Sequence, residues 1–169
     1  MTLGKHSCQE SVKRSNFSPV QNEALAKRVS KNLRQKFKDD ANVLAMLPDE
    51  QYVQAGNSRL FVPIRGTDDY ATLASVVTSS VDKIRANYLG RVSDLMTAAI
   101  ENQKKPALFL LRPSDECLAN LEQRDASRLD DVIDHLNYNT SKQGVFIESE
   151  SCEQELHEKM EFWMRKKAA

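Results

Sequence analysis

Two short apolar runs in the second half of the chain constrain the fold more than any other sequence feature. Residues 107–111 are continuously apolar and lie between Pro106 and Pro113, as expected for a strand covered on both faces. Gly144 precedes another apolar run at residues 145–147, which predicts a second short buried strand. Helical patterns separate the two runs, so we expect parallel neighbouring strands joined by a right-handed crossover.

Three helices are predicted around these strands. Ser114 caps a short helix after the first strand, and Ser127 begins a second helix with apolar residues at i, i+3, i+4 and i+7. Ser151 and Gln154 form a capping box for a final helix, which ends in basic residues. The alternation of strands and helices is typical of an α/β layer.

A β-hairpin is predicted upstream of these elements. Residues 52–55 and 59–64 favour β structure on either side of a Gly-Asn-Ser turn, and Pro63 predicts an edge position. The expected fold class is therefore α/β (or α+β), with a small mixed sheet of about four strands packed by helices. The hairpin and the two parallel buried strands would form this sheet, accompanied by one long central helix and a basic N-terminal helix.

The long central helix is predicted over residues 68–103. Apolar side chains recur every three or four residues from Leu73 to Ala99, which holds one stripe along a nearly straight helix. A break at Gly90 is the alternative, because glycine weakens a helix interior. If the protein forms a homodimer, we expect this stripe to be the contact between the two copies. The alternative is that the stripe packs on the chain's own sheet.

The amino-terminal part of the chain has a charge opposite to the rest. Residues 1–38 contain nine basic and two acidic side chains, a net charge of +7, so in a chain with 24 residues of each sign the remainder carries −7. Residues 1–17 are polar and aperiodic, which predicts a flexible arm. A capping box then begins a basic amphipathic helix over residues 19–38. We expect residues 18–169 to form a single α/β domain.

The composition argues against several broad classes. No apolar run approaches the roughly 18 residues of a membrane span, and the first residues lack the apolar stretch of a signal peptide, so we expect a cytoplasmic protein that does not bind membranes. Three widely spaced cysteines indicate neither a disulfide framework nor a zinc site, and reduced thiols are expected. Because glycine-rich phosphate-binding motifs and the serine-hydrolase motif are missing from the sequence, no cofactor and no catalytic residues are predicted.

Polar side chains follow both predicted parallel strands and would meet at one edge of the sheet, where open α/β sheets bind ligands. The two groups are Arg112, Ser114 and Asp115 after the first strand, and Glu148, Ser149, Glu150 and Ser151 after the second. A guanidinium beside a hydroxyl and a helix N-terminus suits a phosphate or carboxylate. The alternative is that the serines only cap helices and that the arginine pairs with a local carboxylate.

A second pattern resembles a metal-binding arrangement. Glu153, His157 and Glu161 are spaced i, i+4 and i+8 on the final helix, and Asp131 and His135 are spaced i and i+4 on an earlier one. Such side chains bind a metal when two helices face each other. His135 lies opposite the apolar stripe of its helix, so we expect two solvated acidic faces and no metal.

Three functions fit this sequence. The leading hypothesis is a non-catalytic protein-interaction module, such as an adaptor, accessory or regulatory subunit with a protein partner. The first alternative is a nucleic-acid-binding accessory protein that uses the basic helix, through Lys27, Lys31, Arg34 and Lys38. The same face would also suit an acidic partner or the acidic remainder of the chain. The second alternative is an enzyme or sensor for a phosphorylated or nucleotide ligand at the strand ends.

Overall fold

The computed structural model describes residues 22–168 and confirms the α/β class. Four strands form a mixed sheet in the order β3-β4-β5-β6, in which β4, β5 and β6 are parallel and β3 is antiparallel to β4. The bounds are Ile64–Arg65 (β3), Asp69–Ser75 (β4), Lys105–Leu111 (β5) and Phe146–Glu150 (β6). The predicted parallel pairing of the last two strands is confirmed, and β5 lies inside the sheet.

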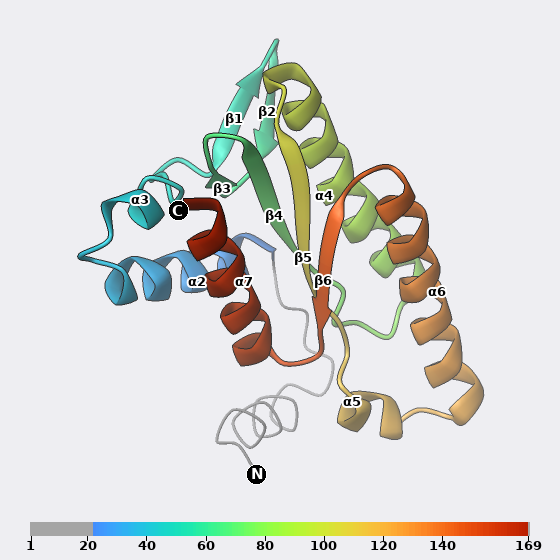
Figure 1. Cartoon of the computed structure of the whole chain (residues 1–169). Helices are drawn as coiled ribbons and strands as arrows, with labels where there is room; N and C mark the ends of the chain where they lie inside the picture. Colours follow the sequence, from blue (N-terminus) through green and yellow to red (C-terminus); the bar gives the residue numbers. More distant parts are fainter. Residues whose placement is uncertain (1–21, 169) are drawn as a thin grey trace.

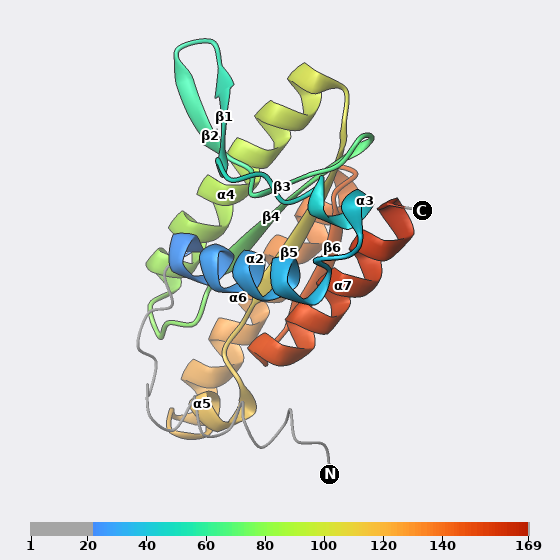
Figure 2. The same cartoon turned by 90° about the vertical axis from the view of Figure 1, so that its left-hand side faces the viewer.

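Helices cover both faces of the sheet and create three layers (Figure 1). Helices α2 and α7 pack on one face, and Figure 2 shows them in front of the strands. Helices α4 and α6 pack on the other face. The helical bounds are Asn22–Lys36 (α2), Ala41–Leu44 (α3), Val81–Asn102 (α4), Asp115–Ala119 (α5), Gln123–Lys142 (α6) and Glu153–Ala168 (α7).

Strand β5 supplies side chains to both hydrophobic cores. Phe109 and Leu111 belong to the core under α2 and α7, whereas Leu108 and Leu110 belong to the core under α4 and α6. This division follows from the alternation of side chains along a strand. Because both faces are buried, β5 needs apolar residues at every position of this segment, which explains the continuous run in the sequence.

The predicted helix over residues 68–103 is wrong in its first part. Residues 69–75 form strand β4, and α4 begins only at Val81, where the Ser80 hydroxyl accepts from the backbone N–H of Lys83. All seven residues of β4 are buried, because helices cover this strand on both faces. Tertiary burial therefore overrides the helical spacing that begins at Leu73. The helix does continue through Gly90, and its apolar stripe packs on the chain's own sheet.

The predicted hairpin exists but does not join the sheet. Strands β1 (Tyr52–Ala55) and β2 (Ser58–Phe61) form a separate two-stranded sheet. The hairpin packs on α4, where the backbone N–H of Phe61 donates to Asp94 Oδ2 at 3.1 Å and the Arg91 guanidinium lies 4.4 Å from the Phe61 ring centroid. Strands β3 and β4 take the places in the sheet that the sequence assigned to the hairpin.

Two other boundaries differ from the sequence prediction. Strand β6 is an edge strand that extends to Glu150, with one exposed and four half-buried residues, so it is neither as short nor as buried as predicted. Helix α6 begins at Gln123 instead of Ser127. The predicted arm over residues 1–17 and the predicted cap at residues 18–21 lie outside the described residues. Among residues 22–168, no helix is long and apolar enough to cross a membrane.

Candidate functional site

The carboxyl ends of β5 and β6 form the first candidate site, because the sequence predicts ligand-binding residues there. Arg112 follows β5, and its backbone N–H donates to the Glu150 carbonyl at 2.9 Å. The Arg112 guanidinium points to α6, where it donates to Asp130 Oδ1 and Asp134 Oδ1, at 2.9 Å in each case. Carboxylates of the same chain therefore already occupy both terminal nitrogens of this guanidinium.

The two carboxylates determine the electrostatics of Arg112. Burial disfavours the charged guanidinium, but the hydrogen bonds and charges of Asp134 and Asp130 outweigh burial and raise the pKa of Arg112 above its ordinary value. The Arg112 side chain is only 19% exposed. The arrangement fastens the segment after β5 to α6, and it leaves an incoming anion without the paired donors that bidentate recognition requires.

The neighbouring predicted residues have local positions. The Ser114 hydroxyl accepts from the backbone N–H of Cys117 at 3.2 Å and so caps α5. Asp115 is exposed in the first turn of the same helix, where a negative charge interacts favourably with the helix dipole. Ser151 is half-buried in the turn before α7.

Glu148 and Ser149 lie in strand β6 and not in a loop, which corrects their predicted setting. They point to opposite faces of the sheet, because Glu148 is level with Phe109 of one core and Ser149 is level with Leu110 of the other. The predicted ligand-binding set is therefore divided between the edge of the sheet and its two faces.

Lysine 159 of α7 binds the two carboxylates that β6 presents on its α7 face. Lys159 Nζ lies 3.0 Å from Glu148 Oε2 and 2.8 Å from Glu150 Oε1. These hydrogen bonds, with Glu150 the larger contributor, raise the pKa of Lys159 above its ordinary value. The contact connects α7 to the edge strand, and its one positive charge offsets one of the two negative charges there.

The basic face of α2 is partly used by the chain itself. Arg34 donates to a backbone carbonyl of the loop before β1 at 2.8 Å and pairs with Asp49 at 2.9 Å. Lys27, Lys31 and Lys38 are exposed. A polar hollow of about 350 Å³ lies beside Lys27, Lys31 and Arg34. Of the four predicted basic residues, one therefore has a structural contact and three extend into solvent.

The acidic face of α7 contacts α2, which corrects the expectation of a solvated face. Glu153 pairs with Arg28 at 3.0 Å, and Glu161 pairs with Lys36. His157 lies between these two carboxylates along α7. Burial lowers the pKa of His157, Glu161 opposes that effect and Lys36 adds to it. Among residues 22–168, no three side chains are grouped as metal ligands.

The cysteines depart from the expectation of reduced thiols. Cys117 is a buried free thiol, as expected for a small core residue. Cys152 is disulfide-bonded, so the expectation is wrong for this residue. The physical reason is that spacing along a sequence does not limit which cysteines a fold brings together.

A second candidate site lies at the opposite end of the sheet, where α7 leaves part of β6 uncovered. A groove of about 820 Å³ opens between α7 and the first halves of β5 and β6. Its lining includes Trp163, which is buried and packs edge-on against Phe109 with ring centroids 5.5 Å apart. Phe146 of β6 and Phe162 of α7 also line it, and they are 47% and 67% exposed. The groove therefore has an apolar interior and two solvent-accessible aromatic rings.

Charged side chains surround the apolar part of the groove. The lining contains four lysines and three carboxylates, namely Lys105, Lys159, Lys166, Lys167, Asp69, Glu148 and Glu158. Lys159 binds Glu148, and Lys167 Nζ lies 3.3 Å from Asp69 Oδ1. Within the described part of the chain, Lys105 and Lys166 have no carboxylate partner. This groove thus contains cationic groups that no carboxylate of residues 22–168 neutralises.

The outer edge of β6 borders the groove. The Glu150 carbonyl points to the β5 side, because it accepts from the backbone N–H of Arg112. Backbone groups alternate in direction along a strand, so the N–H and C=O groups of Ile147 and Ser149 point away from β5. No strand of the described residues pairs with this edge. Two residues of β6 are therefore positioned to pair with an added strand.

Comparisons with known proteins give no further guide to the site. The chain matches no protein family model, no curated protein and no solved structure. The assignment of function therefore depends on the geometry of the two candidate sites.

Sequence reasoning missed the groove and its aromatic residues. Phe162 lies next to Trp163 in the sequence. The available signal was helical geometry: Lys159, Phe162 and Lys166 are spaced i, i+3 and i+7, which places them on one face of α7. The position of that face beside an edge strand depends on the three-dimensional arrangement and could not be read from spacing.

Proposed function

We propose that this protein is an adaptor that binds an extended segment of a partner protein along the outer edge of β6. The segment would pair with the backbone of Ile147 and Ser149 and place apolar side chains in the groove beside α7. Strand addition of this kind obtains affinity from main-chain hydrogen bonds and specificity from pockets for alternate side chains.

The observation that carries this proposal is the coincidence of the groove with an unpaired strand edge. Five large hydrophobic side chains are exposed in the described residues, and two of them, Phe146 and Phe162, line this one groove. Exposed aromatic rings next to each other are typical of interaction sites, whereas single exposed hydrophobic residues are ordinary.

The charges in the groove favour binding over proton-transfer chemistry. Lys159 holds Glu148, and Lys167 holds Asp69, so most carboxylates in the lining are ion-paired. A general acid or base needs a pKa tuned toward the working pH, and the pKa of Lys159 is shifted away from it. The carboxyl end of the sheet is a weaker candidate, because the Arg112 guanidinium is already bound to α6.

The test uses a phage-displayed library of random twelve-residue peptides selected on the 169-residue chain. Ser149→Pro removes the outward backbone N–H and blocks the strand edge, so the affinity of selected peptides should fall about tenfold or more. Ser149→Val is the matched control, because it keeps the N–H and the Ser149 hydroxyl has no hydrogen-bond partner to lose. Isothermal titration calorimetry measures both variants.

N-methylation of the peptide backbone provides a readout that does not depend on the stability of a proline variant. A peptide that adds as a strand pairs through every second residue, so methylation should reduce binding at alternate positions only. Uniform tolerance of methylation, equal binding by Ser149→Pro, or a selection that yields no edge-dependent peptide contradicts the proposal.

A further inference from the structure

We infer that the segment bound at β6 is acidic and that Lys105 and Lys166 bind its carboxylates. This inference rests on the proposed function and adds the chemical class of the partner. The partner segment would combine an apolar side chain for the groove with one or more aspartate or glutamate residues next to it.

The topology explains why lysines gather at this end of the sheet. Helices α4, α6 and α7 each follow or precede a parallel strand and run in the opposite direction, so their C-terminal ends lie near the amino ends of the strands (Figure 1). The negative pole of a helix dipole favours cations at its C-terminus. The lysines at this end are Lys104, Lys105, Lys142, Lys166 and Lys167.

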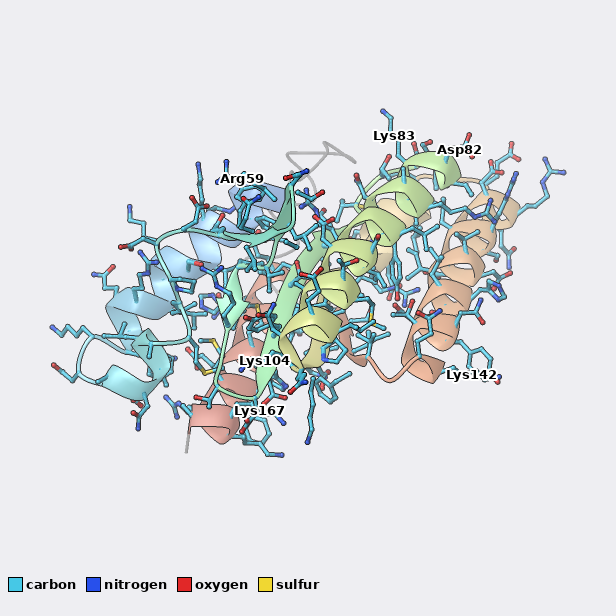
Figure 3. All side chains as sticks on the ribbon, turned by 90° about the horizontal axis from the view of Figure 1, so that it is seen from above. Arg59, Asp82, Lys83, Lys104, Lys142 and Lys167 are labelled. Carbon is cyan, nitrogen blue, oxygen red and sulfur yellow. The ribbon has the colours of Figure 1, made fainter. Side chains whose placement is uncertain are left out.

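Most of these lysines already have partners. Lys104 and Lys167 are both labelled in Figure 3: Lys104 donates to the Thr67 carbonyl in the turn before β4, and Lys167 pairs with Asp69, the first residue of β4. Lys142 Nζ lies 4.4 Å from the ring centroid of its own helix neighbour Tyr138. Of these five lysines, Lys105, Lys166 and Lys167 line the groove. Lys166 contacts the Phe162 ring, as Lys142 contacts Tyr138, but Lys105 and Lys166 have no carboxylate partner within residues 22–168 and therefore provide the positive charge that is available to a ligand there.

Lys105 and Lys166 are displaced from the aromatic residues in the same direction. Ala107 is level with Phe146 in the sheet, so Lys105 lies two residues, or about 7 Å, beyond the start of β6. Lys166 lies one helical turn beyond Phe162, and its Nζ is 5.3 Å from that ring centroid. A segment with its apolar side chain at the rings would thus reach the lysines about two residues later.

The carboxylates of the groove favour an acidic peptide over a nucleic acid. Glu148 and Glu158 line the same groove as the two lysines. A nucleic acid carries a phosphate at every nucleotide and would bring negative charge along the whole length of β6. A peptide can place carboxylates only where the lysines lie and apolar side chains elsewhere, so its charge distribution can match this surface.

The decisive experiment repeats the peptide selection and then reverses the charge of the two lysines. Peptides selected on the unmodified chain should contain aspartate or glutamate on one side of an apolar residue. The double variant Lys105→Glu/Lys166→Glu should weaken their binding about tenfold or more, because repulsion replaces attraction. Lys27→Glu/Lys31→Glu on α2 is the matched control, with the same change in net charge on exposed residues away from the groove, and it should change affinity less than about twofold.

The outcomes separate this inference from the proposed function. Selected peptides that lack acidic residues, or that bind the Lys105→Glu/Lys166→Glu variant equally well, overturn the inference, while loss of binding in Ser149→Pro still supports strand addition. Weakening by the α2 variant instead assigns the anion site to α2 and also overturns it. Displacement of the acidic peptide by a single-stranded oligonucleotide or by anionic vesicles indicates a general polyanion surface, which is a third result against it.

Discussion

The two ends of the sheet have opposite charge and differ in how far the protein satisfies that charge itself. At the carboxyl ends of the strands, helices begin with acidic residues, and Asp130 and Asp134 of α6 hold Arg112. At the amino ends, helices finish near lysines, and Lys105 and Lys166 have no carboxylate partner within residues 22–168. The sequence motif for a ligand lies at the first end, whereas the two lysines without a carboxylate partner in the described residues lie at the second.

This difference shows that the residue types at a strand end do not suffice to define a ligand site. An arginine beside a serine resembles an anion site only until its partners are known. A guanidinium that carboxylates already bind is a poor ligand site, because a ligand would have to displace those carboxylates. A lysine without a carboxylate partner has no ion pair to break when a ligand binds. The amino end of the sheet is therefore the better candidate for a binding site.

The largest effect we expect concerns the groove at the amino end of the sheet, and it tests whether the interior of that groove is packed. Trp163→Ala should lower the free energy of unfolding by about 3–5 kcal/mol, because it removes a buried ring that packs on Phe109. Phe162→Ala should change that free energy by less than about 0.5 kcal/mol, because the ring is largely exposed. Urea unfolding followed by circular dichroism measures both. Equal losses would mean that Phe162 is packed and that the groove is closed.

A smaller effect compares one cation from each end. Arg112→Met should lower the free energy of unfolding by about 1–2 kcal/mol, since it keeps the length of the side chain but leaves Asp130 and Asp134 without their partner. Lys105→Met should leave stability unchanged within about 0.5 kcal/mol, because it removes no ion pair. The same urea titrations apply. Similar losses of unfolding free energy in the two variants would contradict the distinction between an ion-paired cation at the carboxyl end of the sheet and an unpaired cation at the amino end.

The smallest effect concerns pH and the ion pairs between α2 and α7. Burial holds the pKa of His157 in the folded protein below its value in the unfolded chain, so the unfolded chain binds a proton first as the pH falls. The stability that His157 contributes is complete above the unfolded pKa of about 6.5 and is lost progressively below it.

Urea unfolding at about pH 7.5 and about pH 5.5 tests this dependence on either side of the unfolded histidine pKa. His157→Gln should reduce the loss of stability on acidification. The exposed His135 is the matched control, and His135→Gln should leave the loss unchanged. An identical loss in all three proteins would show that His157 titrates as an exposed histidine does.

The elements that sequence could predict are those whose local pattern and tertiary environment agree. Strand β5 was predicted because burial on both faces requires the continuous apolar run between two prolines. Strand β4 was missed because Ala71, Thr72 and Ala74 resemble neither an apolar run nor an alternating strand, and Leu73 fits a helical spacing. A usable signal was present, since residues 70–81 contain no charged side chain.

The candidate site was less predictable than the fold, because it depends on which groups remain without partners. The sequence correctly indicated that a local carboxylate could pair with Arg112, but not that α6 would supply two of them. The sequence placed Glu148 in a loop. In the structure β6 continues through Glu148, because it pairs with β5 and contacts α7, and local sequence does not reveal these tertiary contacts. The exposure of Phe162 follows from the limited coverage of β6, which no spacing rule expresses.

The order of the strands in space has a consequence for synthesis of the chain. Because β3, β4, β5 and β6 are neighbours in the order in which the ribosome makes them, each strand can pair with the one completed just before it. Strand β6 is the last of the four to emerge, and α7 follows it directly. The most recently made strand of the nascent chain thus always has one unpaired edge, and in the described part of the folded protein the outer edge of β6 stays unpaired.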